Sequence, residues 1–338
     1  SGMEAITTGA NRIALGELNT VLAAGVESMS NIPVLYSNTM KKWLWQLMKA
    51  KTPYNKLASL LKFRPHFLKP VIALELGLTD PIVKQLMGQT AENLASEFAI
   101  SRLEQDNFAL ESHNKALAAT AAGTFAPEIM PIATPPQYKQ VVEHDNGPRD
   151  NQSLEQLAKL RPFFNKRGSV TVGSSSQISD GAAAVILMDG AQAKQQGHKI
   201  LGWLTGYAYA GCEPERMGLG PTYASAKLLA QTKMTLSDID LIEMNEAFAA
   251  QVLANLQAFA SDKFAGKFLN LPKAIGEIDM QKLNVNGGAI ALGHPLGMTG
   301  TRLVITLLHQ LRSRGLQHGL ASLCIGGGQG ASLLVEAA

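Results

Sequence analysis

The stretch NVNGGAIALGHPLGMTG, residues 284–300, sets a histidine among glycines immediately before a long helical pattern. That pattern runs on to Gly315, so we expect a Gly-rich loop that leads into a long helix. Glycine permits positive φ angles and close backbone approach, which leaves backbone N–H groups free to face a ligand. The stretch therefore indicates a turn in which His294 is available for chemistry.

Two other stretches place a reactive side chain in a similar setting. Asn245 follows an apolar run in MNEAFAA (244–250), and Cys324 precedes the glycines of SLCIGGGQG (322–330). A thiol beside backbone N–H groups, with a histidine nearby, can form an acid/base pair next to an oxyanion site. Simpler interpretations are open at this point: a small buried apolar role for Cys324, a helix N-cap for Asn245, and an ordinary loop position for His294.

The composition is that of a globular protein. With 338 residues, 46% of them hydrophobic and 17% charged, the chain predicts two or three structural units rather than disorder. The net charge of +3 is too small to predict nucleic-acid binding. Cys212 and Cys324 do not indicate a disulfide framework and fit a reducing compartment. No His/Cys cluster has metal-ligand spacing, so we expect no metal.

Apolar patterns alternate between helical and strand periods along the chain. Residues 3–18 and 90–122 predict helices, and Ser101 with Glu104 three positions later is a helix-start signature. Residues 20–27 read as a buried parallel strand. Further strands are expected at 199–211 and 241–243 and around the glycines of 319–337. Strands that alternate with helices predict a mostly parallel sheet covered on both faces.

Several blocks resemble the sequence signatures of the thiolase family, in the same order and over nearly the whole chain. They are AGVESMSNIP (24–33), MGQTAENLASEFAISRLEQDNFALESHNKA (87–116), SSSQISDGAAAVILM (174–188), NEAFAA (245–250), NVNGGAIALGHPLGMTG (284–300) and LCIGGGQGASLLVE (323–336).

The resemblance implies an α/β fold of the αβαβα thiolase type. Two similar α/β/α halves, each with a five-stranded mixed sheet, are expected, with a mainly helical loop domain inserted in the first. The expected boundaries are 1–32 and 166–197 for the N-terminal half, 33–165 for the inserted domain, and 198–338 for the C-terminal half.

The first residues, SGMEA, resemble a C-x-S-G-[LM] block whose cysteine is the nucleophile in thiolases. That cysteine is expected two positions before Ser1, so the first half is expected to be truncated at its N-terminus. Either upstream residues precede the chain, or it cannot form an acyl-enzyme.

The activity that the resemblance implies is an acyl transfer: CoA-dependent thiolytic cleavage of a 3-oxoacyl-CoA to acetyl-CoA and a shortened acyl-CoA, or the reverse Claisen condensation. His294 would take the proton of the nucleophile, and Cys324 would protonate the acetyl-CoA enolate. Asn245 would hold a water at the enolate oxygen, and the N–H of Gly326 would serve the tetrahedral oxyanion. Coenzyme A is a substrate here, and no permanently bound cofactor is expected.

Other residues are assigned to the binding of substrate and CoA by the same resemblance. Ser176 matches a serine that contacts the pantetheine region, and Met87 lies on the loop that lines the acyl pocket. Leu86 stands where many thiolases have a histidine that contacts CoA, so that contact is in doubt. Gly293 is expected beside the same site.

A basic segment interrupts the pattern between Ser28 and Leu74, which contains no Asp or Glu. Its helical stretch, 41–69, contains Trp43 and Trp45 beside Lys41 and Lys42. It is interpreted as a solvated helical face, a helix that docks on a membrane or a partner, or a patch for CoA phosphates. Tryptophan among lysines favours an interface.

This segment and the insertion between Asn245 and His294 resemble the thiolase subunit of the trifunctional β-oxidation complex. The implied partners are acyl-CoA and CoA, a second copy in a homodimer or tetramer, a β-oxidation multienzyme partner, and a membrane surface. The implied compartment is the bacterial cytoplasm or the mitochondrial matrix. Two alternatives are kept: a biosynthetic acetoacetyl-CoA thiolase, and a truncated, non-catalytic homologue that binds acyl-CoA.

Overall fold

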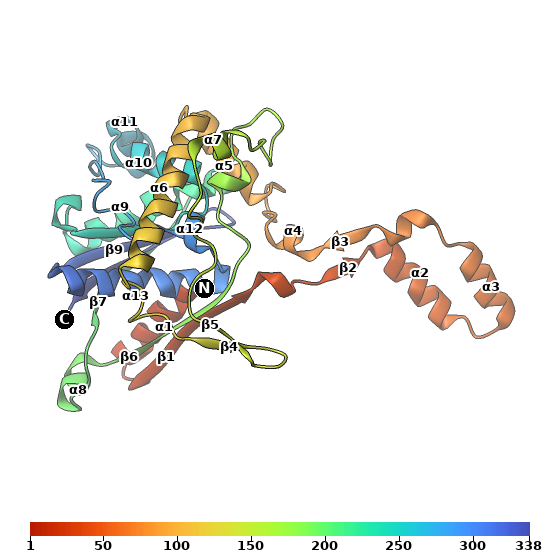
Figure 1. Ribbon diagram of the computed structural model, residues 1–338, viewed down its shortest axis with the longest axis horizontal. Coiled ribbons are helices and arrows are strands. Elements are labelled where there is room, and N and C mark those ends of the chain that lie inside the picture. The colour runs from red at the N-terminus through yellow and green to blue at the C-terminus, as the bar shows by residue number, and fades with distance from the viewer. The chain divides into compact units, whose positions relative to one another are not determined.

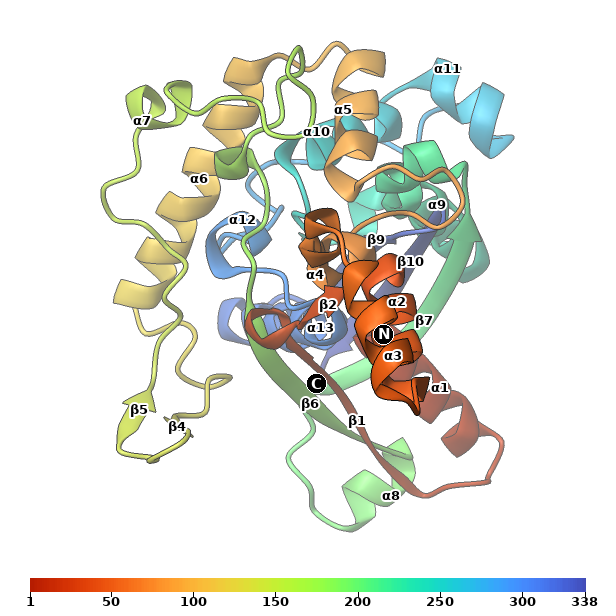
Figure 2. The same ribbon diagram turned by 90° about the vertical axis from the view of Figure 1, so that its right-hand side faces the viewer.

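The computed structural model describes residues 1–338 and separates into two compact units. The larger unit consists of Ser1–Ser28 and Asp80–Ala338, and the smaller one of Met29–Thr79. Figures 1 and 2 show the ribbon from two directions. Each unit is described by itself.

The larger unit contains a four-stranded sheet with the order β7 (Gly202–Gly211), β10 (Gln329–Ala337), β9 (His318–Ile325) and β8 (Leu241–Met244). Strand β10 is antiparallel to both β7 and β9, whereas β8 is parallel to β9. Every residue of β8 is buried, as expected for a strand with both faces covered. This sheet brings the carboxyl ends of β8 and β9 to the same edge.

A second sheet pairs β1 (Thr20–Ser28) with β6 (Asp180–Met188) in antiparallel register, from Thr20 opposite Met188 to Ser28 opposite Asp180. Its side chains alternate in exposure. A third pairing, β4 (Ile132–Thr134) with β5 (Gln140–Val142), forms a short antiparallel hairpin.

Two helices lie between the large sheets. Helix α13 (Leu296–Arg314) contacts β1 and β6 as well as β8, β9 and β10, and α1 (Gly2–Ala14) packs beside it (Figures 1 and 2). Their shared core includes Met3, Ile6, Leu303, Leu307, Leu311, Leu323 and Leu333.

The two central helices cross at glycines. A Cβ on Gly300 would lie 2.6 Å from the backbone N of Met3, and one on Gly2 would lie 2.5 Å from Thr301 Oγ1. No other residue type fits at either position without displacing the partner helix, so the backbones themselves set the helix separation.

The remaining helices cover the outer face of the four-stranded sheet. Helix α9 (Gly220–Thr232) packs on β7, β9 and β10, and α10 (Ala249–Phe259) packs on α5 (Met87–Glu97), α6 (Arg102–Ala121) and α9. Shorter segments complete the unit: α7 (Leu154–Ala158), α8 (Gly190–Gln195), α11 (Asp262–Phe264), α12 (Ala289–Leu292), the 3₁₀ turns Val172–Ser174, Pro214–Leu219 and Leu236–Asp238, and a π-helical turn at Ala265–Leu269.

The smaller unit is a helical hairpin on a two-stranded stem. Strands β2 (Val34–Tyr36) and β3 (Pro70–Ile72) pair in antiparallel fashion, and α2 (Asn38–Lys49) and α3 (Pro53–Leu61) lie between them in the chain. The 3₁₀ turns Met29–Asn31 and Pro65–Leu68 and helix α4 (Ala73–Gly77) flank them. Ser37 and Thr52 cap α2 and α3 through side-chain oxygens. No helix of either unit combines the length and apolar character that crossing a bilayer requires.

Several predictions of local structure are confirmed. The helix predicted over 3–18 is α1, the strand over 20–27 is β1, and the capping box of Ser101 and Glu104 opens α6. The strand β1, however, is antiparallel and half-exposed rather than parallel and buried, and only β8–β9 is a parallel pair. The four-stranded sheet is thus mixed, as the resemblance to thiolases implies, and the two-stranded sheets are antiparallel, so the prediction of a mostly parallel sheet is wrong.

The predicted five-stranded sheets have four and two strands in residues 1–338. The fifth position of the larger sheet is held by a single parallel bridge between Ile242 and Leu283. Beyond it, the side chain of Asn284 accepts a hydrogen bond from Met244 N and donates one to Met244 O, both 2.9 Å long. A side-chain amide thereby replaces the next residues of a strand.

The separate compact unit, 29–79, is shorter than the inserted domain expected over 33–165. The difference arises because α5 and α6 pack against α10, and α6 also packs against α12. Residues 80–165 consequently belong with the larger unit.

Candidate active site

Two loops bring Asn245 and His294 together at the N-terminal end of α13, and Cys324 lies on strand β9. Asn245 follows β8, and its backbone N donates to Ser322 O on β9 (2.9 Å), two residues before Cys324. His294 and Pro295 immediately precede α13. The Nδ2 atom of Asn245 lies 3.3 Å from Nε2 of His294. The structure therefore joins two of the three predicted loops directly.

The hydrogen bonds of His294 define its tautomer. Thr299 Oγ1 donates to Pro295 O (3.0 Å), so it accepts from His294 Nδ1 at 2.7 Å. With its proton on Nδ1, the ring presents the lone pair of Nε2 to the amide of Asn245. Burial, together with the positive charges of Arg302 and the Ser1 amino group, lowers the pKa of His294 to about 4. His294 is therefore a neutral base at pH 7.

Asn245 is fully buried and holds one unsatisfied atom. Its Oδ1 has no partner within the protein, although its Nδ2 faces His294. A buried amide oxygen without a partner is costly unless a water or ligand donates to it. The position is therefore suited to holding a water beside His294.

Cys324 lies on β9 in an apolar cluster with Ala91, Val170, Ala247 and Phe248, against which Met87 also packs. Its side chain is 8% exposed. Burial raises the pKa of the Cys324 thiol to about 12. The group is thus a thiol at neutral pH and can give up a proton only to a strong base such as an enolate.

The pKa values of these two groups are shifted in opposite directions. His294 is kept unprotonated and can act as a base, and Cys324 is kept protonated and can act as an acid. Pairs of titratable groups whose environments separate their pKa values are typical of acid/base catalysis. The arrangement can therefore accept one proton and donate another without either group being charged at rest.

The glycine turn after β9 is held by a hydrogen bond to Asp80, which lies far away in the sequence. Gly327 N donates to Asp80 Oδ2 (2.7 Å), and Asp80 Oδ1 accepts from Ile82 N and Val83 N. Although burial opposes the shift, these backbone donors lower the pKa of Asp80. A Cβ on Gly326 would lie 3.4 Å from Met87 Sδ, so the predicted oxyanion residue and the predicted pocket residue are neighbours.

Ser176 lies beside the Asn245 block, because its backbone N donates to Ala247 O at 3.0 Å. Next to it, Gln177 Nε2 donates to the carbonyls of Gly147, Ile290 and Ala291. This glutamine therefore connects the loop that contains Ser176 to α12, just before His294, a role that its sequence position did not reveal.

The remaining predicted binding residues occupy backbone roles. Leu86 is the N-cap residue of α5, and its N–H is bound by Gln89 Oε1 at 2.8 Å. Gly293 has a φ of 96°, and a Cβ there would lie 2.2 Å from Ser179 Oγ. Gly293 is thus required by the turn that orients His294.

In the smaller unit, the predicted docking residues divide into two groups. Trp43 is turned into the hairpin: its Nε1 donates to Ser59 O (2.8 Å), and its ring lies 5.1 Å from that of Phe63. Trp45 is 61% exposed, with the ammonium of Lys49 over its ring. Lys41 and Lys42 are exposed. Trp43 is therefore a packing residue, and Trp45 is the one available to a surface.

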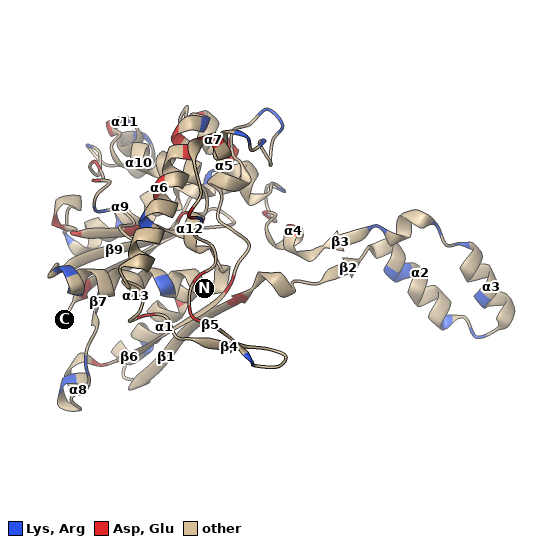
Figure 3. Cartoon of the chain, viewed as in Figure 1, with Lys and Arg blue, Asp and Glu red and all other residues tan.

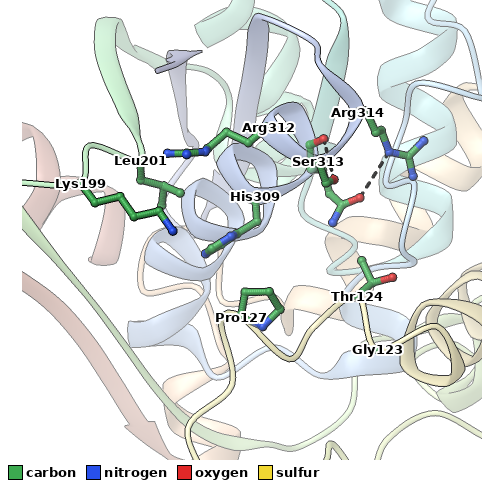
Figure 4. Close-up of a pocket in the computed structure, with 10 residues that line it drawn as sticks. Gly123, Thr124, Pro127, Lys199, Leu201, His309, Arg312, Ser313 and Arg314 are labelled. Carbon is green, nitrogen blue, oxygen red and sulfur yellow. Dashed lines mark hydrogen bonds between the residues drawn. The ribbon is translucent and has the colours of Figure 1, made fainter.

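A cavity of about 840 Å³, shown in Figure 4, lies at the opposite end of α13. Its lining includes Lys199, His309, Arg312 and Arg314 and none of the predicted site residues. It is therefore separate from the acid/base site. Across the chain, no group of three or more His, Cys, Asp or Glu side chains is arranged to hold a metal.

The chain matches the N-terminal domain of thiolase over residues 1–191 and the C-terminal domain of thiolase over residues 198–337. It therefore belongs to the thiolase family.

Sequence comparison with individual proteins also gives thiolases. The chain is 41% identical to the mitochondrial trifunctional enzyme subunit beta of Rattus norvegicus, over 100% of this chain and 70% of the relative. It is 43% identical to the 3-ketoacyl-CoA thiolase of Shewanella halifaxensis (strain HAW-EB4), over 97% of this chain and 74% of the relative.

Solved structures show the same fold. Human mitochondrial 3-ketoacyl-CoA thiolase in complex with CoA matches with a TM-score of 0.83 and 37% identity, over 100% of this chain and 76% of that one. The acetyl-CoA acetyltransferase of Bacillus anthracis matches with a TM-score of 0.84 and 38% identity, over 100% and 77%. The fold of the chain is the thiolase fold.

Proposed function

We propose that this chain carries the acid/base and oxyanion groups of a 3-oxoacyl-CoA thiolase. The reaction is the CoA-dependent cleavage of a 3-oxoacyl-CoA to acetyl-CoA and a shortened acyl-CoA, and its reverse. The observation that carries the proposal is the contact of Asn245 with neutral His294, near a strand end that bears the buried thiol of Cys324.

The residues divide the steps between them. His294 Nε2 takes the proton of the attacking thiol and becomes an imidazolium, whose new N–H can bond to the oxygen of the enolate. The C2–C3 bond breaks, and the Cys324 thiol delivers its proton to the carbon of the departing enolate. Free CoA then gives its thiol proton to the Cys324 thiolate, its sulfur takes the acyl group, and the released sulfur of the nucleophile recovers its proton from His294. A water held by Asn245 Oδ1 is the second donor to the enolate oxygen, and Gly326 N–H serves the tetrahedral oxyanion.

The nucleophile is proposed for the position two residues before Ser1. In support, the Ser1 nitrogen at the amino end of α1 lies close enough to His294 for a charge placed on it to act on the ring, so a residue that precedes Ser1 would lie near the base. The intact mass of the protein from its source is compared with 36.1 kDa to test this assignment. A mass that leaves no room for an upstream cysteine would contradict it.

The residues of the chain itself are tested by a partial reaction. Reversible removal of an α-proton from acetyl-CoA needs Cys324, His294 and Asn245 but no acylated cysteine. In D₂O the chain should exchange these protons, as followed by NMR, and Cys324→Ser and His294→Ala should abolish the exchange. Cys212→Ser removes the other thiol and is the matched control. Absence of exchange in the unmodified chain, with acetyl-CoA bound, would favour the non-catalytic, CoA-binding alternative.

Medium- or long-chain substrates and a role in β-oxidation are proposed from the relatives named as trifunctional enzyme subunit beta and 3-ketoacyl-CoA thiolase. Thiolysis rates for C4 to C16 substrates distinguish this from a biosynthetic acetoacetyl-CoA thiolase, which would prefer C4. The same relatives support a multienzyme partner, and the bacterial cytoplasm or the mitochondrial matrix as the compartment.

We also propose that the smaller unit binds an anionic membrane surface. No acidic residue occurs from 29 to 74, and in Figure 3 the ribbon of α2 and α3 carries blue Lys and Arg positions and no red Asp or Glu positions. Exposed apolar side chains accompany them: Trp45, Met48, Tyr54, Leu57 and Leu61. An exposed basic and apolar helical surface is typical of interfacial binding.

Vesicle sedimentation tests this surface. Binding to vesicles with 30% anionic lipid should weaken by about tenfold when Trp45 and Met48 are replaced by Ser, and should fall with added salt. Trp43 is left intact so that the hairpin keeps its packing. Equal binding to neutral and anionic vesicles, or no effect of the double substitution, would rule the surface out.

A homodimer or tetramer is proposed as well. Leu22 on β1 and Ile186 on β6 lie opposite each other and are 68% and 71% exposed, which leaves an apolar sheet face that a second copy can cover. Light scattering of the purified protein decides between a monomer and an assembly.

A further inference from the structure

Glu246, the residue directly after Asn245, is buried within the larger unit and is 1% exposed. Its Oε2 accepts from Ser112 Oγ (2.6 Å) and from Ile290 N (3.2 Å), and its Oε1 accepts from Asn284 Nδ2 (2.8 Å). All of these partners are donors. The carboxylate therefore joins the end of β8 to α6 and to the loop that leads to His294.

The loop 284–290, which leads to His294, is held by several further hydrogen bonds. Ser112 Oγ, besides donating to Glu246, accepts from Gly288 N at 3.1 Å. Asn284 uses its amide to hold both the N and the O of Met244. A Cβ on Gly288 would lie 2.3 Å from Glu246 Cδ, so the backbone passes directly over the carboxylate. The loop 284–290 is thus built around this side chain.

The hydrogen bonds of Glu246 help to set the relative positions of Asn245 and His294. Ile290 belongs to α12, which ends two residues before His294, while Asn245 is attached to Glu246 through one peptide bond. A shift of either strand end or loop would alter the contact between Asn245 Nδ2 and His294 Nε2. Ser112 and Asn284 also contact both segments, and both donate to Glu246, which is the charged group that this network shares.

We infer that Glu246 is a positioning residue that holds Asn245 and His294 in register for enolate stabilisation, an inference that rests on the function proposed above. A glutamine cannot take its place. Both carboxylate oxygens accept from donors, and an amide NH₂ at either position would face a donor with another donor. Displacements of about 1 Å are enough to reduce a catalytic rate by about 100-fold.

The test compares Glu246→Gln with Asp106→Asn. Asp106 is also buried, pairs with Arg102 at 2.8 Å and lies on the same helix as Ser112, so its loss measures a purely structural effect. In D₂O exchange of acetyl-CoA, Glu246→Gln should lower the saturated rate by about 100-fold. The half-saturating concentration should change by less than about twofold, as expected when ground-state binding is untouched. Asp106→Asn should alter neither.

Amide hydrogen exchange by mass spectrometry gives a readout that does not need activity. Glu246→Gln should deprotect peptides that cover 286–293, while peptides from β9 and β10 stay protected. Unchanged protection of 286–293, or an equal loss of rate in Asp106→Asn, would overturn the inference. If the unmodified chain shows no exchange of acetyl-CoA, the proposed function fails, and the amide measurement still decides the role of Glu246. Should Glu246→Gln not fold, Ser112→Ala removes one donor and should give about a tenfold loss.

Discussion

The side-chain amide of Asn245 lies 3.3 Å from Nε2 of His294, although 49 positions separate the two residues in the chain. The contact directs an amide donor at the lone pair of a neutral ring and leaves Asn245 Oδ1 buried without a protein partner. His294 Nε2 can therefore receive a proton, and Asn245 Oδ1 can accept a hydrogen bond from a water.

The pH dependence of the partial reaction follows from the two shifted groups. The exchanging state needs Cys324 as thiolate and His294 as imidazolium, whereas the resting state has the thiol and the neutral ring. Both states bind the same number of protons, so the saturated exchange rate should be constant between pH 6 and 9, well inside the pKa values of about 4 and about 12.

NMR-detected exchange at several buffered pH values measures this. A tenfold rise per pH unit would mean that the thiolate alone limits the rate and that His294 need not be protonated. A flat profile in the unmodified chain that becomes steep in His294→Asn would support the pairing.

The thiols should be unreactive in the folded protein. Burial raises the pKa of Cys324 to about 12 and, with the nearby Glu213 charge, that of Cys212 to about 11. Because the thiolate is the species that alkylates, iodoacetamide at pH 8 should label both residues at least about 100-fold more slowly than in denaturant. Rapid labelling of Cys324 in the native state, as located by peptide mapping, would contradict the burial of the proposed acid.

Removal of Arg302 should be strongly destabilising. Its Nη1 lies 3.1 Å from Glu243 Oε2, and the Glu243 side chain is only 2% exposed. Arg302→Met leaves that carboxylate buried without its partner, which typically costs about 3–5 kcal/mol. Urea unfolding should show this loss, and the double variant Arg302→Met/Glu243→Gln should recover most of it. A loss that persists in the double variant would assign the effect to packing of the arginine stem instead.

The glycine crossing of α1 and α13 gives a matched pair of substitutions. Gly300→Ala would place a Cβ 2.6 Å from Met3 N and should destabilise the protein by about 1–3 kcal/mol. Gly77→Ala, at a helical glycine with nothing within 4 Å, should be neutral or stabilising by up to about 1 kcal/mol. Thermal unfolding of the two variants compares them, and similar losses in both would show that the close approach is relaxed in solution.

Local features of the fold were predictable from the sequence, because they depend on near neighbours. The capping box of Ser101 and Glu104 is an example, since both partners lie within one helical turn. The loops of Asn245 and His294 were predictable as well, whereas Cys324 lies on strand β9 just before the predicted glycine turn rather than in it.

Long-range contacts were not predictable in this way. Nothing in the periodicity indicates that Glu246 reaches Ser112 or that Asn284 completes the sheet edge beside Met244. The inward turn of Trp43 depends on the return of α3 and on Phe63, so composition alone placed it on the surface. The antiparallel β1–β6 pair was missed because an apolar run fits a buried parallel strand equally well.

The contact of Gly2 and Gly300 with the opposing backbone has a consequence for how this protein can vary over evolutionary time. A spacing that is set by main-chain atoms does not change when neighbouring core residues exchange leucine for isoleucine or methionine. The amino end of α1 and the turn that carries His294 are therefore insulated from sequence drift in the surrounding core. Homologous chains could diverge widely in their packing and still keep these two points at one separation.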